Sequence, residues 1–177
     1  MKSYLQKLLE RFFKEEDATA LVEAALLTPV MLTLLMGSFD LGQGIMMNQK
    51  AITASQIAAD LVSRAKTVSQ SDVDNIVNGS KLAFHPHSTS SFGIDVVSLE
   101  YDKDSLPFEL WRDTRNMTPN QTAVDSTAGL PAEKDGMIIV TVQYTYTPFF
   151  SGMLTDDINI QEVAFTRGRR SRTVTWE

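Results

Sequence analysis

The feature that most constrains this chain is an apolar run from Thr19 to Phe39, TALVEAALLTPVMLTLLMGSF, which contains one acid, Glu23, and one proline, Pro29. An α-helix rises about 1.5 Å per residue, so about 20 residues cross the hydrocarbon core of a bilayer. The run therefore predicts a membrane-spanning helix near the N-terminus. The other segments are interpreted by whether they precede or follow this membrane-spanning helix.

Length and charge limit what the rest of the chain can be. The chain has 177 residues, of which 43% are hydrophobic, and a net charge of −6, with acids exceeding bases only after residue 70. One modest domain besides the helix fits this length. A nucleic-acid partner is not expected, because binding nucleic acid needs a broad basic face. The chain has no cysteine, so neither a disulfide nor a thiolate site is available.

The segment before the apolar run has the pattern of a short cytoplasmic leader. Residues 1–17 place leucines and phenylalanines at helical spacing among three lysines and one arginine. The basic residues favour a cytoplasmic N-terminus, and the segment either lies on the membrane surface or has no role of its own. A cleaved secretory signal is disfavoured, because the apolar run exceeds an ordinary h-region and no A-x-A-like site follows Gly37.

The helical pattern continues beyond Phe39 in a more polar register, to about Ala65. A continuous helix from Thr19 would be about 70 Å long, and only half of that length fits in a membrane. The outer half is expected to lay one apolar face on a partner. Gly37 and Gly42, near the exit from the membrane, predict either a kink or close packing of helices.

The remaining residues predict a small head with one short helix and several strands. The helix is expected over 71–84, with Ser71 as N-cap and Leu82 in its buried stripe. Alternating apolar residues predict a strand over 92–101 that contains a bulge, and a short strand over 108–112. Residues 116–135 are polar and are expected to form a long surface loop.

The clearest strand is 137–147, MIIVTVQYTYT, in which the residues from Ile138 to Tyr146 alternate and Pro148 ends the strand. Two further crossings, over 158–166 and 173–176, would complete a small antiparallel sheet. The expected fold class is therefore α+β, with the long helix covering the apolar face of the sheet. The predicted division is a leader over 1–18, a long helix over 19–70 with its transmembrane half at 19–39, and a soluble head over 71–177.

No motif in the sequence predicts an enzyme. Catalytic signatures such as G-x-S-x-G, a Gly-rich phosphate loop and H-E-x-x-H are missing, and Ser63 to Lys66 matches S-x-x-K only as a short polar pattern. His85 and His87 flank a proline and are too few for a metal site. We expect no catalytic residue, no metal and no cofactor. The four arginines within 167–172 either contact lipid headgroups or an acidic partner, or keep an edge strand soluble.

Glu23 needs a partner. An ionised carboxylate costs on the order of 3 kcal/mol at the centre of a bilayer. If the chain were cut just upstream, a new α-amine would lie one helical turn from Glu23. In an assembly, the amine of one subunit could then meet the carboxylate of another.

The spacing of the residues in the helix resembles that of the TadE-like pseudopilins of tight adherence (Tad) pili, which are relatives of type IV pilins. Glu23 falls at the acid of their first turns, and Pro29 follows six residues later. Gly37, Asp40 and Gly42 then complete the family's pattern of glycine, acid and glycine. The likeness covers residues 18 to about 65, and it implies a pilin-like fold.

The resemblance also implies roles for individual residues. A prepilin peptidase would cut between Ala18 and Thr19, and Glu23 would set the register between assembled subunits. Pro29, Gly37, Asp40 and Gly42 would form the family's helix motif. The family usually has glycine before the cut and often a bulky residue after the glutamate, where this chain has Ala18 and Ala24.

The function that the resemblance implies is that of a minor pseudopilin in the priming, capping or assembly of a Tad-type adhesion pilus. The implied partners are other pilin and pseudopilin subunits, a prepilin peptidase, the inner-membrane assembly platform and the lipid bilayer. The implied location is a single pass through the inner membrane, with a cytoplasmic N-terminus and a periplasmic head, and incorporation into an extracellular pilus stays open. The alternative is a permanently anchored envelope protein whose head binds a partner or scaffolds a secretion machine, and an enzyme with an unrecognised site ranks third.

Overall fold

The computed structural model describes residues 16–129, 135–151 and 156–177. The predicted leader lies almost wholly outside these residues. Along the chain the elements are α2 (Glu16–Ser63), β1 (Thr67–Val68), α3 (Gln70–Lys81), the 3-10 turn η1 (Leu82–Phe84), β2 (Gly93–Tyr101), β3 (Pro107–Arg115), α4 (Gln121–Asp125), β4 (Gly136–Tyr146), β5 (Ile158–Thr166) and β6 (Thr175–Trp176). The α+β class predicted from the sequence is confirmed.

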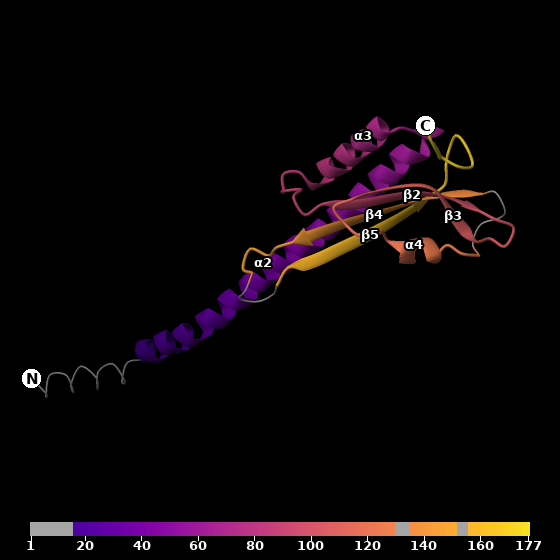
Figure 1. Cartoon of the computed structure of the whole chain (residues 1–177). Coiled ribbons are helices and arrows are strands. Elements are labelled where there is room, and N and C mark those ends of the chain that lie inside the picture. The colour runs from indigo at the N-terminus through magenta and orange to yellow at the C-terminus, as the bar shows by residue number, and fades with distance from the viewer. Residues whose placement is uncertain (1–15, 130–134, 152–155) are drawn as a thin grey trace, which may run out of the picture.

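Helix α2 organises the molecule. It has 48 residues with Pro29 inside it, which corresponds to about 72 Å of helix. Its first half projects away from the head, and its second half runs behind the sheet (Figure 1). The chain therefore has the form of a stalk with a head packed on one end.

The head is built on a four-stranded antiparallel sheet in the order β3-β2-β4-β5. β4 lies at its centre because the run from Ile138 to Val142 is buried on both faces. The register between β2 and β3 shifts at Ser98/Leu99, which confirms the predicted bulge. β3 is longer than the predicted strand over 108–112.

Both faces of the sheet are covered. One face packs against α2 and α3 through Ile94, Val96, Val140 and Val142, and Met47 and the alanines of α2 complete this core. The other face packs on α4 through a smaller cluster, in which Leu99 and Ile139 contact Ala123 and Val124. The sheet is therefore the middle layer of the head.

Three predictions about the head are wrong. α3 is capped by Ser69 rather than Ser71, because Ser69 and Asp72 form a reciprocal capping box. Leu82 follows α3 in η1 and is 73% exposed rather than buried. The predicted loop over 116–135 also contains a helix, α4, for which Asn120 provides the N-cap by accepting from the N–H of Ala123.

The predicted last strand is not part of the antiparallel sheet. β6 pairs in parallel with β1, in a separate two-stranded sheet. After β5 the chain turns back to the end of α2, where the N–H of Arg169 donates to the carbonyl of Ser63 at 2.8 Å. This bond satisfies a carbonyl at the helix C-terminus, and it brings the C-terminal segment to β1.

Candidate functional site

The projecting half of α2 exposes its apolar side chains. Residues 19–35 are all exposed in the chain, and α2 contains the one segment of the described residues that is long and apolar enough to cross a membrane. The large exposed side chains of this half are Leu21, Val22, Leu26, Leu27, Val30, Met31, Leu32, Leu34, Leu35 and Phe39. Soluble proteins rarely expose such a surface, so the first half of α2 is a single-pass membrane anchor.

Glu23 lies on this exposed half. Within the described residues its carboxylate takes part in no hydrogen bond or ion pair, and its side chain is exposed. Thr19 lies four residues earlier, which is about one turn of helix. The described part of this chain therefore provides no partner for the Glu23 carboxylate.

Pro29 interrupts the backbone hydrogen bonds of this half, because it has no N–H to donate to the carbonyl four residues earlier. The helix nevertheless continues through it. The neighbouring hydroxyls are satisfied within the helix, since Thr28 donates to the carbonyl of Ala24 at 2.6 Å and Thr33 donates to that of Pro29 at 2.8 Å. These threonines therefore add little polar cost in an apolar environment.

Asp40 marks the point where α2 meets the head. Its side chain is 1% exposed, and its two carboxylate oxygens accept the backbone N–H groups of Phe149 and Phe150 at 2.9 and 3.0 Å. The loop after β4 is thus fastened to the helix by a pair of charge-assisted hydrogen bonds. Sequence reasoning singled out Asp40 but missed both phenylalanines; the pair of aromatic residues directly after the strand-ending Pro148 was the available signal.

The glycines near Asp40 have different surroundings. A Cβ atom added at Gly44 would lie 3.5 Å from Cδ1 of Ile158, an ordinary contact with the sheet, whereas at Gly42 it would meet nothing within 4 Å. Gly37 lines a shallow groove with Ser38 and Ile158. Gly42 therefore lies on a face of α2 that the head leaves open.

The residues predicted to matter thus occupy one continuous stretch of α2. Residues 18–60 match the TadE-like protein family model. This confirms the predicted resemblance over the stalk and the part of α2 beneath the sheet, and it associates the chain with Tad pili. No curated protein and no solved structure matches the chain.

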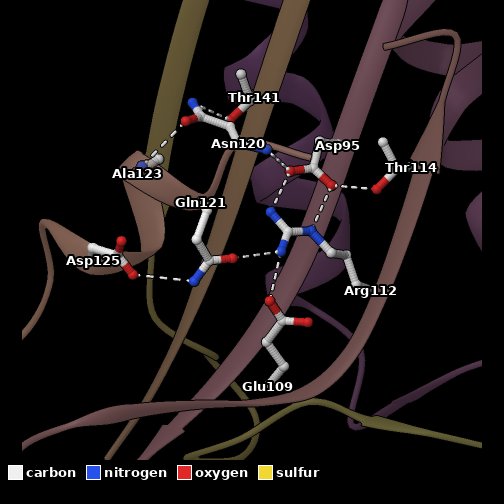
Figure 2. A network of polar contacts seen from close by, with 9 residues as sticks. All are labelled: Asp95, Glu109, Arg112, Thr114, Asn120, Gln121, Ala123, Asp125 and Thr141. Carbon is white, nitrogen blue, oxygen red and sulfur yellow. Dashed lines mark hydrogen bonds and ion pairs between the residues drawn. The ribbon is translucent and has the colours of Figure 1, made fainter. Parts of the chain in front are cut away.

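Outside the TadE-like segment, the most extensive polar cluster in the described residues lies on the face of the sheet that carries α4 (Figure 2). Asp95 on β2 is 1% exposed. Arg112 on β3 binds both of its oxygens, with N···O distances of 2.9 and 2.8 Å, and Thr114 donates to it at 2.6 Å. The N–H of Asn120 donates to the same carboxylate at 2.9 Å. Asp95 therefore joins β2, β3 and the start of α4.

Electrostatics keep Asp95 ionised. Burial raises the pKa of this carboxyl, but the hydrogen bonds from Arg112, Thr114 and the Asn120 N–H outweigh burial and hold the pKa below its ordinary value. The side chain of Asn120 also donates to Thr141 on β4, at 3.2 Å. Because both oxygens of Asp95 are engaged, this cluster links β2, β3, β4 and the start of α4 within the head.

The other residues that the sequence brought forward have structural surroundings. Ser63 is buried and donates to the carbonyl of Asp60, while Lys66 is exposed. His85 and His87 are exposed, and no group of three metal-binding side chains occurs among the residues that the structure describes. The arginine segment follows β5 and is not an edge strand, and its Arg169 forms an ion pair with Asp60 at 2.7 Å.

Proposed function

We propose that this chain is a minor pseudopilin that takes part in the priming, capping or assembly of a Tad-type pilus. The observation that carries the proposal is the uncovered apolar half of α2, which holds an unpartnered Glu23 at the position of the acid in a TadE-like segment. A helix of this kind is covered either by lipid or by the helices of other subunits. Both situations occur in a pilin that waits in a membrane and then assembles.

The proposed arrangement puts a leader over 1–18 in the cytoplasm, the spanning half over 19–39 in the inner membrane, and the head over 71–177 in the periplasm. The second half of the long helix, within 19–70, stays with the head because Ala51, Ala54 and Ala58 are wholly buried beneath the sheet. The head is thus carried rigidly by the helix. Its partners would be pilin and pseudopilin subunits and the assembly platform of the inner membrane.

Cleavage between Ala18 and Thr19 is the processing step of the proposal. This bond lies near the start of the described part of α2. Cleavage would leave the new amine of Thr19 one turn from Glu23.

The intact mass of the chain from membranes with and without the prepilin peptidase tests the processing step. We expect the mass to fall by residues 1–18 only when the peptidase is present. Ala18→Gly is the matched variant, because it supplies the family's usual residue, and it should be cut at least as completely as the natural chain. Retention of Met1 in all samples would rule out processing.

The assembly role of Glu23 is tested by Glu23→Ala. We expect normal membrane insertion and a loss of piliation, because the variant loses the carboxylate that pairs with the amine of a neighbour. Glu177→Ala is the matched control, since it removes an exposed acid at the far end of the chain, and it should leave piliation unchanged. Normal piliation of Glu23→Ala would contradict the register role.

A second candidate function is favoured by Ala18, which stands where the family usually has glycine. A chain that is never cut would remain a fixed membrane anchor, and its head would bind a partner or scaffold a secretion machine. This candidate predicts that the full-length chain persists in the membrane and that the chain is dispensable for piliation. The mass measurement therefore separates the two candidates.

A further inference from the structure

Three phenylalanines form an exposed cluster where the stalk meets the head. Phe39 from α2 packs edge-on against Phe149 and Phe150, with ring centroids 6.4 and 6.5 Å apart, and the latter two lie 5.0 Å from each other. Phe149 is 79% exposed and Phe39 is 51% exposed. We call these three residues the phenylalanine collar.

The collar continues the apolar surface of the stalk. Together with Leu32, Leu35 and Met36 it lines an open hollow of about 400 Å³ that has only apolar side chains. On α2, residues 32, 35, 36 and 39 follow the spacing of one helix face. Phe149 and Phe150, in the loop after β4, therefore widen the apolar surface that these residues form on α2.

Asp40 fixes the collar in place. Its carboxylate accepts the backbone N–H groups of both loop phenylalanines, so the backbone of this loop cannot leave α2 without breaking these bonds. The buried Pro148 precedes them and ends β4. A loop fastened in this way keeps Phe149 and Phe150 beside α2, where both rings pack on Phe39.

The depth of the collar matches the surface of a bilayer. Thr19 and Phe39 are twenty residues apart, and about 20 residues of helix span the hydrocarbon core of about 30 Å. A helix that begins its crossing at Thr19 therefore brings Phe39 to the opposite boundary. Phe149 and Phe150 lie at the same level, and the polar residues Asp40 and Gln43 follow directly on α2.

We propose that the phenylalanine collar inserts into the outer boundary of the lipid bilayer and seats the head on the membrane at a fixed depth. Lipid is the occupant because the hollow is continuous with the spanning surface and lies at the depth of the bilayer boundary. Apolar rings at this boundary gain free energy by leaving water. This inference depends on α2 spanning the membrane and not on the proposed role in a pilus. The experiment below therefore tests it independently of that role.

The natural absence of cysteine allows one spin label to be placed at a chosen site. Phe149→Cys and Phe165→Cys are matched variants, because both replace exposed phenylalanines and Phe165 lies on β5 in the head. The labelled full-length chains are reconstituted in vesicles of phosphatidylethanolamine and phosphatidylglycerol at a low ratio of protein to lipid. Collision of each label with oxygen, which concentrates in lipid, is compared with collision with a water-soluble nickel chelate.

We expect the label at position 149 to collide several-fold more often with oxygen than with the nickel chelate, and the label at position 165 to show the reverse. A label at 149 that meets the nickel chelate as freely as the one at 165 would place the collar in water and overturn the proposal. A label at 149 that meets neither reagent, with broadening that grows with protein density, would place the collar between copies of the chain and also overturn it. Unchanged thermal melting of both variants verifies that the head is intact.

Discussion

The two halves of α2 belong to one helix but have opposite patterns of exposure. In the first half, large apolar side chains such as Leu26 and Leu34 are 71% and 69% exposed. In the second half, small apolar side chains such as Ala54 and Ala58 are wholly buried against the sheet. A soluble helix buries its largest apolar residues first. The first half is therefore built for lipid or for other subunits, and the second half for the head of its own chain.

The acidic residues of the head and of the projecting half of α2 also differ in whether they have partners. Asp40 and Asp95 are buried in the head, and every oxygen of theirs has a partner. Glu23 on the projecting half has no partner among the described residues. Satisfied carboxylates hold a fold together, whereas an unsatisfied one in an apolar surface points to an interaction outside the chain. Variants of these acids test whether the head and the projecting half are independent.

The largest effect is expected for Asp95→Ala. The variant leaves Thr114 and the N–H of Asn120 without their acceptor, while Arg112 still pairs with Glu109. Breaking a buried pair costs about 3 to 5 kcal/mol, and the remaining partner places the expected loss at the lower end, about 3 kcal/mol. The free energy of unfolding, measured by denaturant titration of the full chain in micelles, should fall by that amount. Trp111 is 7% exposed, and its fluorescence reports the head. An unchanged stability would mean that α4 and the sheet do not depend on this pair.

The pH dependence of stability checks the same pair independently. The pKa of Asp95 is lower in the folded chain than in the unfolded chain, so its contribution is fully present above the unfolded value of about 4. It is lost as the pH falls through the folded value. We expect the natural chain to lose stability below about pH 4, and Asp95→Asn to lose less over the same range. Parallel curves for the two chains would contradict this assignment.

The next effect in size is expected from Ala54→Leu. The added carbons have no room between α2 and the sheet, and overpacking of this kind costs about 1 to 3 kcal/mol. Ala25→Leu makes the same change on the exposed half of the helix and should leave the melting of the head unchanged. Equal effects of the two variants would show that the halves of α2 do not differ in their surroundings.

A similar but local effect is expected from Asp40→Asn. An amide offers one oxygen and one NH₂ group where the carboxylate offers two oxygens, so either Phe149 or Phe150 loses its acceptor and faces a donor. Leaving one buried N–H unpaired costs about 1 to 3 kcal/mol. We expect faster hydrogen exchange in residues 147–151 and unchanged exchange in β2. Protection of the loop equal to that in the natural chain would contradict its attachment through Asp40.

The sequence was most informative where local patterns decide the structure. The spanning half of α2 follows from an apolar run of sufficient length, and β4 follows from strict alternation that Pro148 ends. The bulge of β2 was readable because the apolar phase shifts by one residue, at Ser98/Leu99. Each of these features depends on residues close together in the chain.

The sequence was least informative where residues far apart decide the structure. The partners of Asp40 lie more than a hundred residues later, and β6 pairs with β1 because the Arg169 segment returns to α2. α4 has 5 residues, too few for a periodic pattern, and it depends on Asn120 and Asp95. The N-cap of α3 was missed for a local reason, because Ser69 and Ser71 each have an acid three residues later and the sequence pattern does not separate them.

The smallest effect on the head is expected from Glu23→Gln. The carboxylate contacts nothing in the described part of the chain, so the free energy of unfolding of the head should change by no more than about 0.5 kcal/mol. Denaturant titration beside Asp40→Asn, an equally conservative change, provides the comparison. A loss of stability from Glu23→Gln as large as that from Asp40→Asn would mean that the projecting half contributes to the fold of the head. A stable head combined with failed assembly would instead assign Glu23 to contacts between subunits, because removing the charge itself makes the helix easier to hold in lipid.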